Sequence, residues 1–204
     1  MTVRVKICGI TRLEDALEAV RLGADALGFN FWPKSKRHCP AEVAAEIISR
    51  LPPFVATVGV FVNQSRAEIN RVVARTGIGA VQLHGDEAPE LAEALKRPVI
   101  RAVRIEDRAS LEELERWSAS AFLLDTASAG YGGSGKTFDW RLAKGAGKRF
   151  PILLAGGLTP ENVADAVKQV RPYGVDVASG VESAPGLKDS RKMRRFITAA
   201  KEAL

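Results

Sequence analysis

The feature that most constrains this chain is a strand-like run followed by a helix-like run, repeated eight times within 204 residues. Short apolar runs alternate with segments of helical periodicity, and little chain is left between them. Such alternation is typical of parallel strands joined by helices. The predicted strands are Val3–Cys8, Ala26–Phe31, Val55–Val62, Ala80–His84, Val99–Arg104, Ala121–Asp125, Ile152–Ala155 and Val175–Ser179. The predicted helices are Leu13–Leu22, Ala41–Leu51, Ala67–Thr76, Pro89–Leu95, Leu111–Trp117, Asp139–Ala146, Pro160–Val170 and Ser190–Ala203.

Eight units of similar length favour a closed barrel over an open sheet. No GxGxxG pattern follows the first strand, as it would in a dinucleotide-binding open sheet. The eight units also use nearly the whole chain, which leaves no room for a second domain. We therefore expect an α/β protein with one domain over residues 1–204, a (β/α)8 TIM barrel with eight parallel strands, although alternative closures stay open.

Four predicted helix starts carry their own capping chemistry. Thr11, Ser65 and Ser110 are each followed three residues later by glutamate, which is the spacing of a capping box. Thr159-Pro160 places a capping hydroxyl before a proline at the first helical position. These residues predict where the helices begin.

The composition is that of an ordinary globular protein, with 46% hydrophobic and 26% charged residues. No apolar segment approaches the roughly 20 residues of a membrane span, and the first residues form a strand-like run without a signal peptide's apolar region. We therefore expect a cytoplasmic protein with no membrane partner.

Metal and nucleic-acid binding find little support in the sequence. Neither Cys8 nor Cys39 belongs to a metal-ligand spacing, so no metal is expected; a disulfide is disfavoured by the expected compartment, although the sequence does not exclude it. The net charge is +6, but the basic residues are scattered, and the densest run, Lys188 to Arg195, is interpreted as a solvated helix face. We expect no nucleic-acid partner and a field that steers anionic small molecules.

Strand alternation predicts a partly polar barrel lumen. In the first strand Val3, Val5 and Ile7 face the helices, while Lys6 and Cys8 face inward. The same count places four other polar residues inside: Gln82, His84, Asp125 and Asp176. A charge in the lumen needs a partner, and strands one and eight adjoin when the barrel closes, so Lys6 is predicted to pair with Asp176.

Two glycine turns predict a phosphate site. Gly156-Gly157 leads into a predicted helix start, and Ser179-Gly180 follows the eighth strand. Glycine lets backbone N–H groups approach an anion, and barrel enzymes commonly hold phosphate in the loops after strands seven and eight. The alternative is that these glycines only form tight turns.

Cys8 and Asp125 are the candidate proton-transfer residues because both lie at strand ends, where barrel active sites are built. The position of Cys8 before a glycine argues against burial, although a free cysteine is more often a small buried hydrophobe. Catalysis would need its thiolate, which Arg37 could favour if it lay nearby. Asp125 ends an apolar run and either caps the next turn or donates a proton.

The segment from Gly130 to Gly135-Lys136-Thr137 satisfies the P-loop pattern GxxxxGK[ST]. A genuine P-loop follows the first strand of an open sheet, whereas this segment follows the sixth strand of a barrel pattern. We interpret it as a lid over the site rather than a nucleotide site.

The chain resembles phosphoribosylanthranilate isomerases along its full length. The resemblance begins at Val5-Lys6-Ile7-Cys8-Gly9-Ile10-Thr11. It continues through Gly23–Phe29, Ser35-Lys36-Arg37, Val58–Asn63, Val81-Gln82-Leu83-His84-Gly85, Leu123-Leu124-Asp125, Gly132–Trp140, Ala155-Gly156-Gly157-Leu158 and Val175–Glu182. So many segments in one order make the match specific, and it accounts for the lid segment without a nucleotide.

This resemblance implies a reaction and a set of roles. The substrate would be N-(5′-phosphoribosyl)anthranilate and the product 1-(2-carboxyphenylamino)-1-deoxyribulose 5-phosphate, formed in tryptophan biosynthesis by an Amadori rearrangement without a metal or organic cofactor. Asp125 would be the general acid and Cys8 the general base. The implied substrate-binding residues are Arg37 for the anthranilate carboxylate, Gln82 and His84, and the backbone of Gly156, Gly157, Ser179 and Gly180 for the phosphate. A monomer or a homodimer is expected.

Three alternatives remain at this point. A related phosphosugar isomerase of histidine biosynthesis, or an enzyme serving both pathways, would carry an aspartate at the end of strand one, where this chain has Cys8. A noncatalytic phosphate-binding barrel would not need both Cys8 and Asp125. Nucleic-acid binding is suggested by charge alone and predicts a steep salt dependence.

Overall fold

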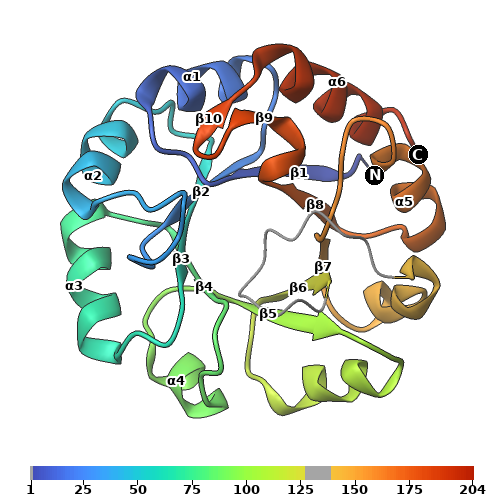
Figure 1. The fold of residues 1–204 in the computed structure, drawn as a ribbon. Helices are drawn as coiled ribbons and strands as arrows, with labels where there is room; N and C mark the ends of the chain where they lie inside the picture. The colour runs from blue at the N-terminus through green and yellow to red at the C-terminus, as the bar shows by residue number, and fades with distance from the viewer. Residues whose placement is uncertain (1, 127–138) are drawn as a thin grey trace.

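The computed structural model describes residues 2–126 and 139–204. The predicted lid segment, Gly130 to Thr137, lies outside these residues, so the lid stays a prediction. Eight parallel strands close into a barrel in chain order, as predicted (Figure 1). Their bounds are β1 Arg4–Cys8, β2 Ala26–Asn30, β3 Ala56–Phe61, β4 Ala80–Leu83, β5 Val99–Ile105, β6 Ala121–Thr126, β7 Ile152–Leu154 and β8 Gly174–Val177.

A ring of helices surrounds the barrel (Figure 1). The α-helices are α1 Leu13–Arg21, α2 Ala41–Ser49, α3 Arg66–Thr76, α4 Pro89–Ala94, α5 Val163–Val170 and α6 Ser190–Lys201. Between β5 and β6 the chain forms the 3-10 helix η1 Ala109–Arg116, and before β7 it forms two short ones, η2 Trp140–Ala143 and η3 Ala146–Lys148. A further 3-10 turn, η4 Ser179–Val181, follows β8. Within the described residues, no helix has the length and apolar character that a membrane crossing requires.

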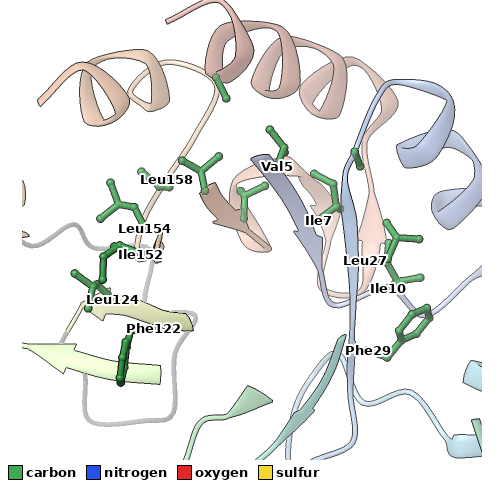
Figure 2. Close-up of a cluster of buried hydrophobic side chains, with 14 of the residues drawn as sticks. Val5, Ile7, Ile10, Leu27, Phe29, Phe122, Leu124, Ile152, Leu154 and Leu158 are labelled. Carbon is green, nitrogen blue, oxygen red and sulfur yellow. The ribbon is translucent and has the colours of Figure 1, made fainter. Parts of the chain in front are cut away.

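The main hydrophobic core lies between the barrel and the helices. Figure 2 shows Val5 and Ile7 of β1 with Leu27 and Phe29 of β2, all of them fully buried. The same layer continues through the alternate residues of β6 and β7: Phe122, Leu124, Ile152 and Leu154. Burying side chains of this size contributes about 1.5–3 kcal/mol each, so this layer is a major stabilising part of the fold.

The lumen has an apolar side and a polar side, as the strand alternation predicted. The apolar side is a separate cluster of inward residues from β3, β5, β6 and β7 and the residue after β7: Val58, Ile100, Ala102, Leu123, Leu153 and Ala155. On the other side Lys6 is buried in β1, directly in register with Asp176 of β8. The Lys6 Nζ donates to Asp176 Oδ1 at 2.7 Å, so the predicted ion pair is confirmed.

The predicted helix starts have mixed outcomes. Ser65 forms the complete capping box with Glu68 at the start of α3. The predicted cap at Thr11 is wrong, because the Thr11 hydroxyl donates instead to the Gly186 carbonyl at 2.6 Å and Arg12 precedes α1. The predicted cap at Ser110 is also wrong, because Ser110 lies inside η1. Thr159 accepts from the N–H of Glu161 at 3.2 Å, but α5 begins only at Val163.

A small antiparallel hairpin between β8 and α6 was not predicted. It consists of β9 Glu182–Ala184 and β10 Leu187–Lys188, joined by a turn with Gly186 at φ +82°. In Figure 1 the hairpin lies beside β1, inside the ring of helices. It changes the interpretation of the basic run from Lys188 to Arg195, because Lys188 is buried in β10 and is not part of a solvated helix face.

Candidate active site

The structure places all nine predicted site residues at the carboxyl ends of strands or in the connections that follow them. They are Cys8 at the end of β1, Arg37 after β2, Gln82 and His84 at β4, Asp125 near the end of β6, Gly156 and Gly157 after β7, and Ser179 and Gly180 after β8. Cys8, Gln82 and Asp125 are buried, and the other residues are partly or fully exposed. This end of the barrel is where enzymes of this architecture carry their active sites.

The Cys8 thiol is buried, contrary to the expectation of an exposed strand end, with 9% of the residue exposed. Gly28 on the neighbouring strand leaves the space it occupies, since a Cβ at Gly28 would lie 2.7 Å from the sulfur. Burial raises the pKa of Cys8, and this effect exceeds the opposing influence of the Lys6 and Lys188 ammonium groups. Burial therefore favours the neutral thiol over the thiolate.

A line of polar contacts crosses the lumen from β1 to β6. The Lys6 Nζ donates to Gln82 Oε1 at 2.9 Å as well as to Asp176. Gln82 Nε2 lies 2.8 Å from His84 Nδ1, and His84 Nε2 lies 3.4 Å from Asp125 Oδ2. Each of these polar groups is paired, which offsets the cost of burying them.

The direction of this line assigns the tautomer of His84. An ammonium group can only donate, so Gln82 must turn its carbonyl oxygen toward Lys6. Its amide nitrogen then donates to His84 Nδ1, and the ring proton is placed on Nε2. His84 consequently presents an N–H group toward Asp125.

The Asp125 carboxyl group is fixed from two sides. Its Oδ1 accepts the N–H of Thr126 at 2.7 Å, which is the turn-capping contact considered in the sequence, and its Oδ2 faces His84. Gly156, at φ +79°, packs directly against it, because a Cβ there would lie 2.9 Å from Asp125 Oδ1 and would collide with Thr126. Gly156 therefore leaves space for the Asp125 carboxyl group and also forms part of the loop after β7.

Arg37 lies beside Cys8, where the sequence alone could not place it. Gly9 packs on its aliphatic stem, since a Cβ at Gly9 would lie 2.6 Å from Arg37 Cδ. The guanidinium forms a bidentate ion pair with Glu182: Nε donates to Oε1 and Nη2 to Oε2, both at 2.7 Å. These bonds raise the pKa of Arg37, to which the nearby Cys8 also contributes.

Sequence reasoning missed Glu182 and Lys188. Lys188 Nζ donates to Glu182 Oε1 at 2.9 Å, and also to the Cys8 carbonyl at 2.6 Å. Desolvation lowers the pKa of Lys188 despite its pairing with Glu182. The Pro185-Gly186 turn between two short strand-like runs is the pattern that could have predicted this hairpin.

The two glycine loops converge. Gly156 and Gly157 are consecutive residues with positive φ, at +79° and +64°. Gly180 packs against the backbone of the first loop, because a Cβ there would collide with the Leu158 carbonyl oxygen. Asn162 braces that loop by donating to the Gly157 carbonyl at 3.0 Å and accepting the N–H of Thr159 at 2.8 Å.

A cleft of about 340 Å³ opens beside β4, β5 and β6 at the mouth of the barrel, which is the end formed by the carboxyl ends of the strands. His84 and Asp125 border it, together with Arg101 and Arg104 of β5 and Trp117, which directly follows η1. Cys8 and Arg37 lie outside this cleft. The described residues contain no cluster of three or more His, Cys, Asp or Glu side chains arranged to hold a metal ion.

The family model described as N-(5′phosphoribosyl)anthranilate (PRA) isomerase matches residues 5–199. A relative from Geobacter metallireducens, named N-(5′-phosphoribosyl)anthranilate isomerase, is 56% identical over 200 residues, which covers 98% of this chain and 99% of the relative.

Two solved structures are similar over 98% of both chains. One is a phosphoribosyl anthranilate isomerase in complex with reduced 1-(o-carboxyphenylamino)-1-deoxyribulose 5-phosphate, at 47% identity and a TM-score of 0.89. The other, at 46% identity and a TM-score of 0.88, is of mutually generated monomers of the dimeric phosphoribosylanthranilate isomerase from Thermotoga maritima.

Proposed function

The chain belongs to the phosphoribosylanthranilate isomerase family, an isomerase of tryptophan biosynthesis, and from this premise we propose that Asp125 is its general acid and Cys8 its general base. The observation that carries the proposal is the order of groups around the mouth. Asp125 on β6, the glycine loops after β7 and β8, Cys8 on β1 and Arg37 after β2 follow one another around the closed barrel. A phosphosugar held at the glycine loops would have its reacting carbons between Asp125 and Cys8.

The proposed mechanism conserves all atoms. Asp125 protonates the furanose ring oxygen, the bond from that oxygen to C1′ breaks, and the anthranilate nitrogen supplies the electron pair for a C1′=N Schiff base. The Cys8 thiolate then removes the C2′ proton, and the C–H electrons form a C1′=C2′ double bond while the nitrogen regains its pair. Transfer of the C2′ hydroxyl proton to the Asp125 carboxylate and protonation of C1′ by the Cys8 thiol give the ketone product and return both residues to their starting forms.

The activity is tested by mixing the purified protein with N-(5′-phosphoribosyl)anthranilate and following the fluorescence of the anthranilate group. Conversion is expected without any added cofactor. The phosphosugar substrate of the histidine-pathway isomerase is assayed in parallel. Its conversion would show that the protein accepts both substrates, and its lack of conversion would show that it accepts only one. A folded protein that binds phosphate but converts neither substrate would be a noncatalytic binding barrel.

Inorganic phosphate or sulfate is expected to bind between Gly156-Gly157 and Ser179-Gly180 in a soaked crystal. The support is the contact between the two loops and the two consecutive positive-φ glycines, a backbone conformation that can turn successive N–H groups toward an anion. An anion ordered elsewhere on the protein, with this position empty, would contradict the assignment.

Arg37→Ala is expected to weaken substrate binding more than it slows bound substrate. A bond between charged groups contributes about 1.5–3 kcal/mol, so the Kd of the reduced product analogue should rise by about 10- to 100-fold. Direct titration is the appropriate measurement, because KM reports binding only when chemistry is slow. An unchanged Kd with a reduced kcat would assign Arg37 to the chemistry instead.

We further propose that the protein is a homodimer, as the Thermotoga maritima relative is described to be. Phe54 lies between α2 and β3, at the barrel end opposite the candidate site, and is 98% exposed. A bulky aromatic on that surface can anchor a symmetric contact that leaves both sites open. Phe54→Ser should shift the mass in light scattering from dimer to monomer with kcat retained. A monomeric parent, or a variant that stays dimeric, would refute this role for Phe54.

A further inference from the structure

The orientation of the Arg37 guanidinium is set by Glu182. The carboxylate binds Nε and Nη2 on one edge of the guanidinium, both at 2.7 Å. A guanidinium has five N–H donors in a rigid plane, so fixing one edge fixes the direction of the others. The Glu182 side chain is 5% exposed and that of Arg37 is 17% exposed, so the held edge faces inward.

Glu182 is itself held in place by its hairpin. Its Oε1 accepts from Lys188 Nζ at 2.9 Å and from the N–H of Gly186 at 3.2 Å. Its backbone carbonyl accepts from Lys192 Nζ at 2.7 Å. Although burial raises the pKa of Glu182, bonds from Arg37 and Lys188 outweigh burial and keep the pKa below its usual range. The carboxylate is therefore charged and has little freedom to turn.

Lys188 connects this hairpin to the strand that carries Cys8. Its side chain is fully buried, and its ammonium group donates to Glu182 Oε1, to the Cys8 carbonyl at 2.6 Å and to the Ala178 carbonyl at 3.3 Å. These three acceptors match the three donors of an ammonium group. The ends of β1 and β8 and the hairpin are thus tied at one point.

We propose that Glu182 is a positioning residue that turns the Arg37 guanidinium toward the carboxylate of the anthranilate ring, and that Lys188 fixes Glu182 relative to Cys8. The inference rests on the proposed function, in which Arg37 binds that carboxylate. It adds a determinant of specificity that does not itself touch the substrate.

If Glu182 acted only through its charge, replacing it would have the opposite effect on carboxylate binding from the effect expected if it positions Arg37. Arg37, Lys188 and Glu182 together carry a charge of +1, and Glu182→Gln raises it to +2, so a purely electrostatic effect would tighten the binding of a carboxylate. Loss of the bidentate ion pair would instead leave the orientation of the guanidinium unfixed and weaken the binding of the carboxylate. The sign of the change therefore separates the two explanations.

The test measures two ligands by direct titration: the reduced product analogue and the same compound lacking the ring carboxyl. The ratio of their Kd values gives the preference for the carboxylate. Glu182→Gln is expected to reduce this preference by about tenfold, with the carboxyl-free ligand little affected. Asp25→Asn is the matched control, because Asp25 also lies between two cations, Arg4 and Lys201, but directly before β2, at the other end of the barrel.

Each outcome has one interpretation. A preference that is unchanged or increased in folded Glu182→Gln overturns the inference, and equal weakening of both ligands indicates a merely structural role and also overturns it. If Arg37→Ala keeps the full preference, the proposed role of Arg37 fails instead. Should Glu182→Gln not fold, Glu182→Asp keeps the charge but shortens the side chain, and the same loss of preference is expected; full retention contradicts the inference.

Discussion

Asp125→Asn is expected to lower kcat by at least about 10²-fold, which is the usual contribution of general acid catalysis. The amide keeps nearly the same shape but cannot transfer a proton to the ring oxygen. One amide oxygen can still accept the N–H of Thr126, as Asp125 Oδ1 does now. We therefore expect a folded variant that binds the substrate and opens its ring slowly.

The measurement is turnover of authentic substrate together with thermal unfolding of the same samples. Asp165→Asn is the matched control, because this aspartate is exposed in the first turn of α5 and is not one of the candidate site residues, so kcat should stay near the parental value. Near-parental kcat in a folded Asp125→Asn protein would rule out Asp125 as the acid.

Cys8→Ser is expected to reduce kcat by a similar factor, at least about 10²-fold, for a different reason. A serine hydroxyl is smaller than the thiol and hardly ionises at neutral pH, so the site would lose its base with little change in packing. The matched control is Cys39→Ser: Cys39 is fully buried outside the site, and a hydroxyl there could donate to the Pro40 carbonyl, which Cys39 Sγ contacts now at 3.7 Å. That control should retain kcat.

The pH dependence follows from the buried state of Cys8. Burial raises the pKa of the thiol, and only the deprotonated form can remove a proton. The rate should therefore increase as pH rises through and above neutrality, with its midpoint above the ordinary thiol value, and this limb should be missing in Cys8→Ser. A rate that is constant across this range would show that thiolate formation does not limit turnover.

The effects of the two substitutions should not simply add. When one proton transfer has become slow, slowing the other changes the overall rate by less than its separate cost. The double variant should therefore lose less activity than the product of the two single losses.

Much of the barrel and its site could be predicted because both follow from periodicity. Closure makes β1 and β8 neighbours, and strand alternation turns Lys6 and Asp176 inward, so their pairing could be predicted from residues 170 positions apart. The same count placed Gln82, His84 and Asp125 on the lumen face. These predictions needed only the order of the strands and the alternation of inward and outward side chains along each strand.

The sequence predictions failed where contacts between distant segments determine the surroundings of a side chain. Burial of Cys8 depends on the space left by Gly28, which no local pattern reveals. The pair between Arg37 and Glu182 joins residues 145 positions apart, one of them in a hairpin whose strands are only two and three residues long. Lys188 belongs to a basic run in the sequence, yet its partners lie on β1, β8 and β9.

The division of labour between Asp125 and Cys8 is tested most directly by the isotope effect on kcat with substrate deuterated at C2′. If Cys8 removes that proton, Cys8→Ser makes the transfer rate-limiting, and deuterium should slow this variant clearly. If Asp125 drives ring opening, Asp125→Asn makes that earlier step limiting, and its isotope effect should fall close to unity. A large isotope effect in Asp125→Asn with none in Cys8→Ser would contradict the assignment of acid and base.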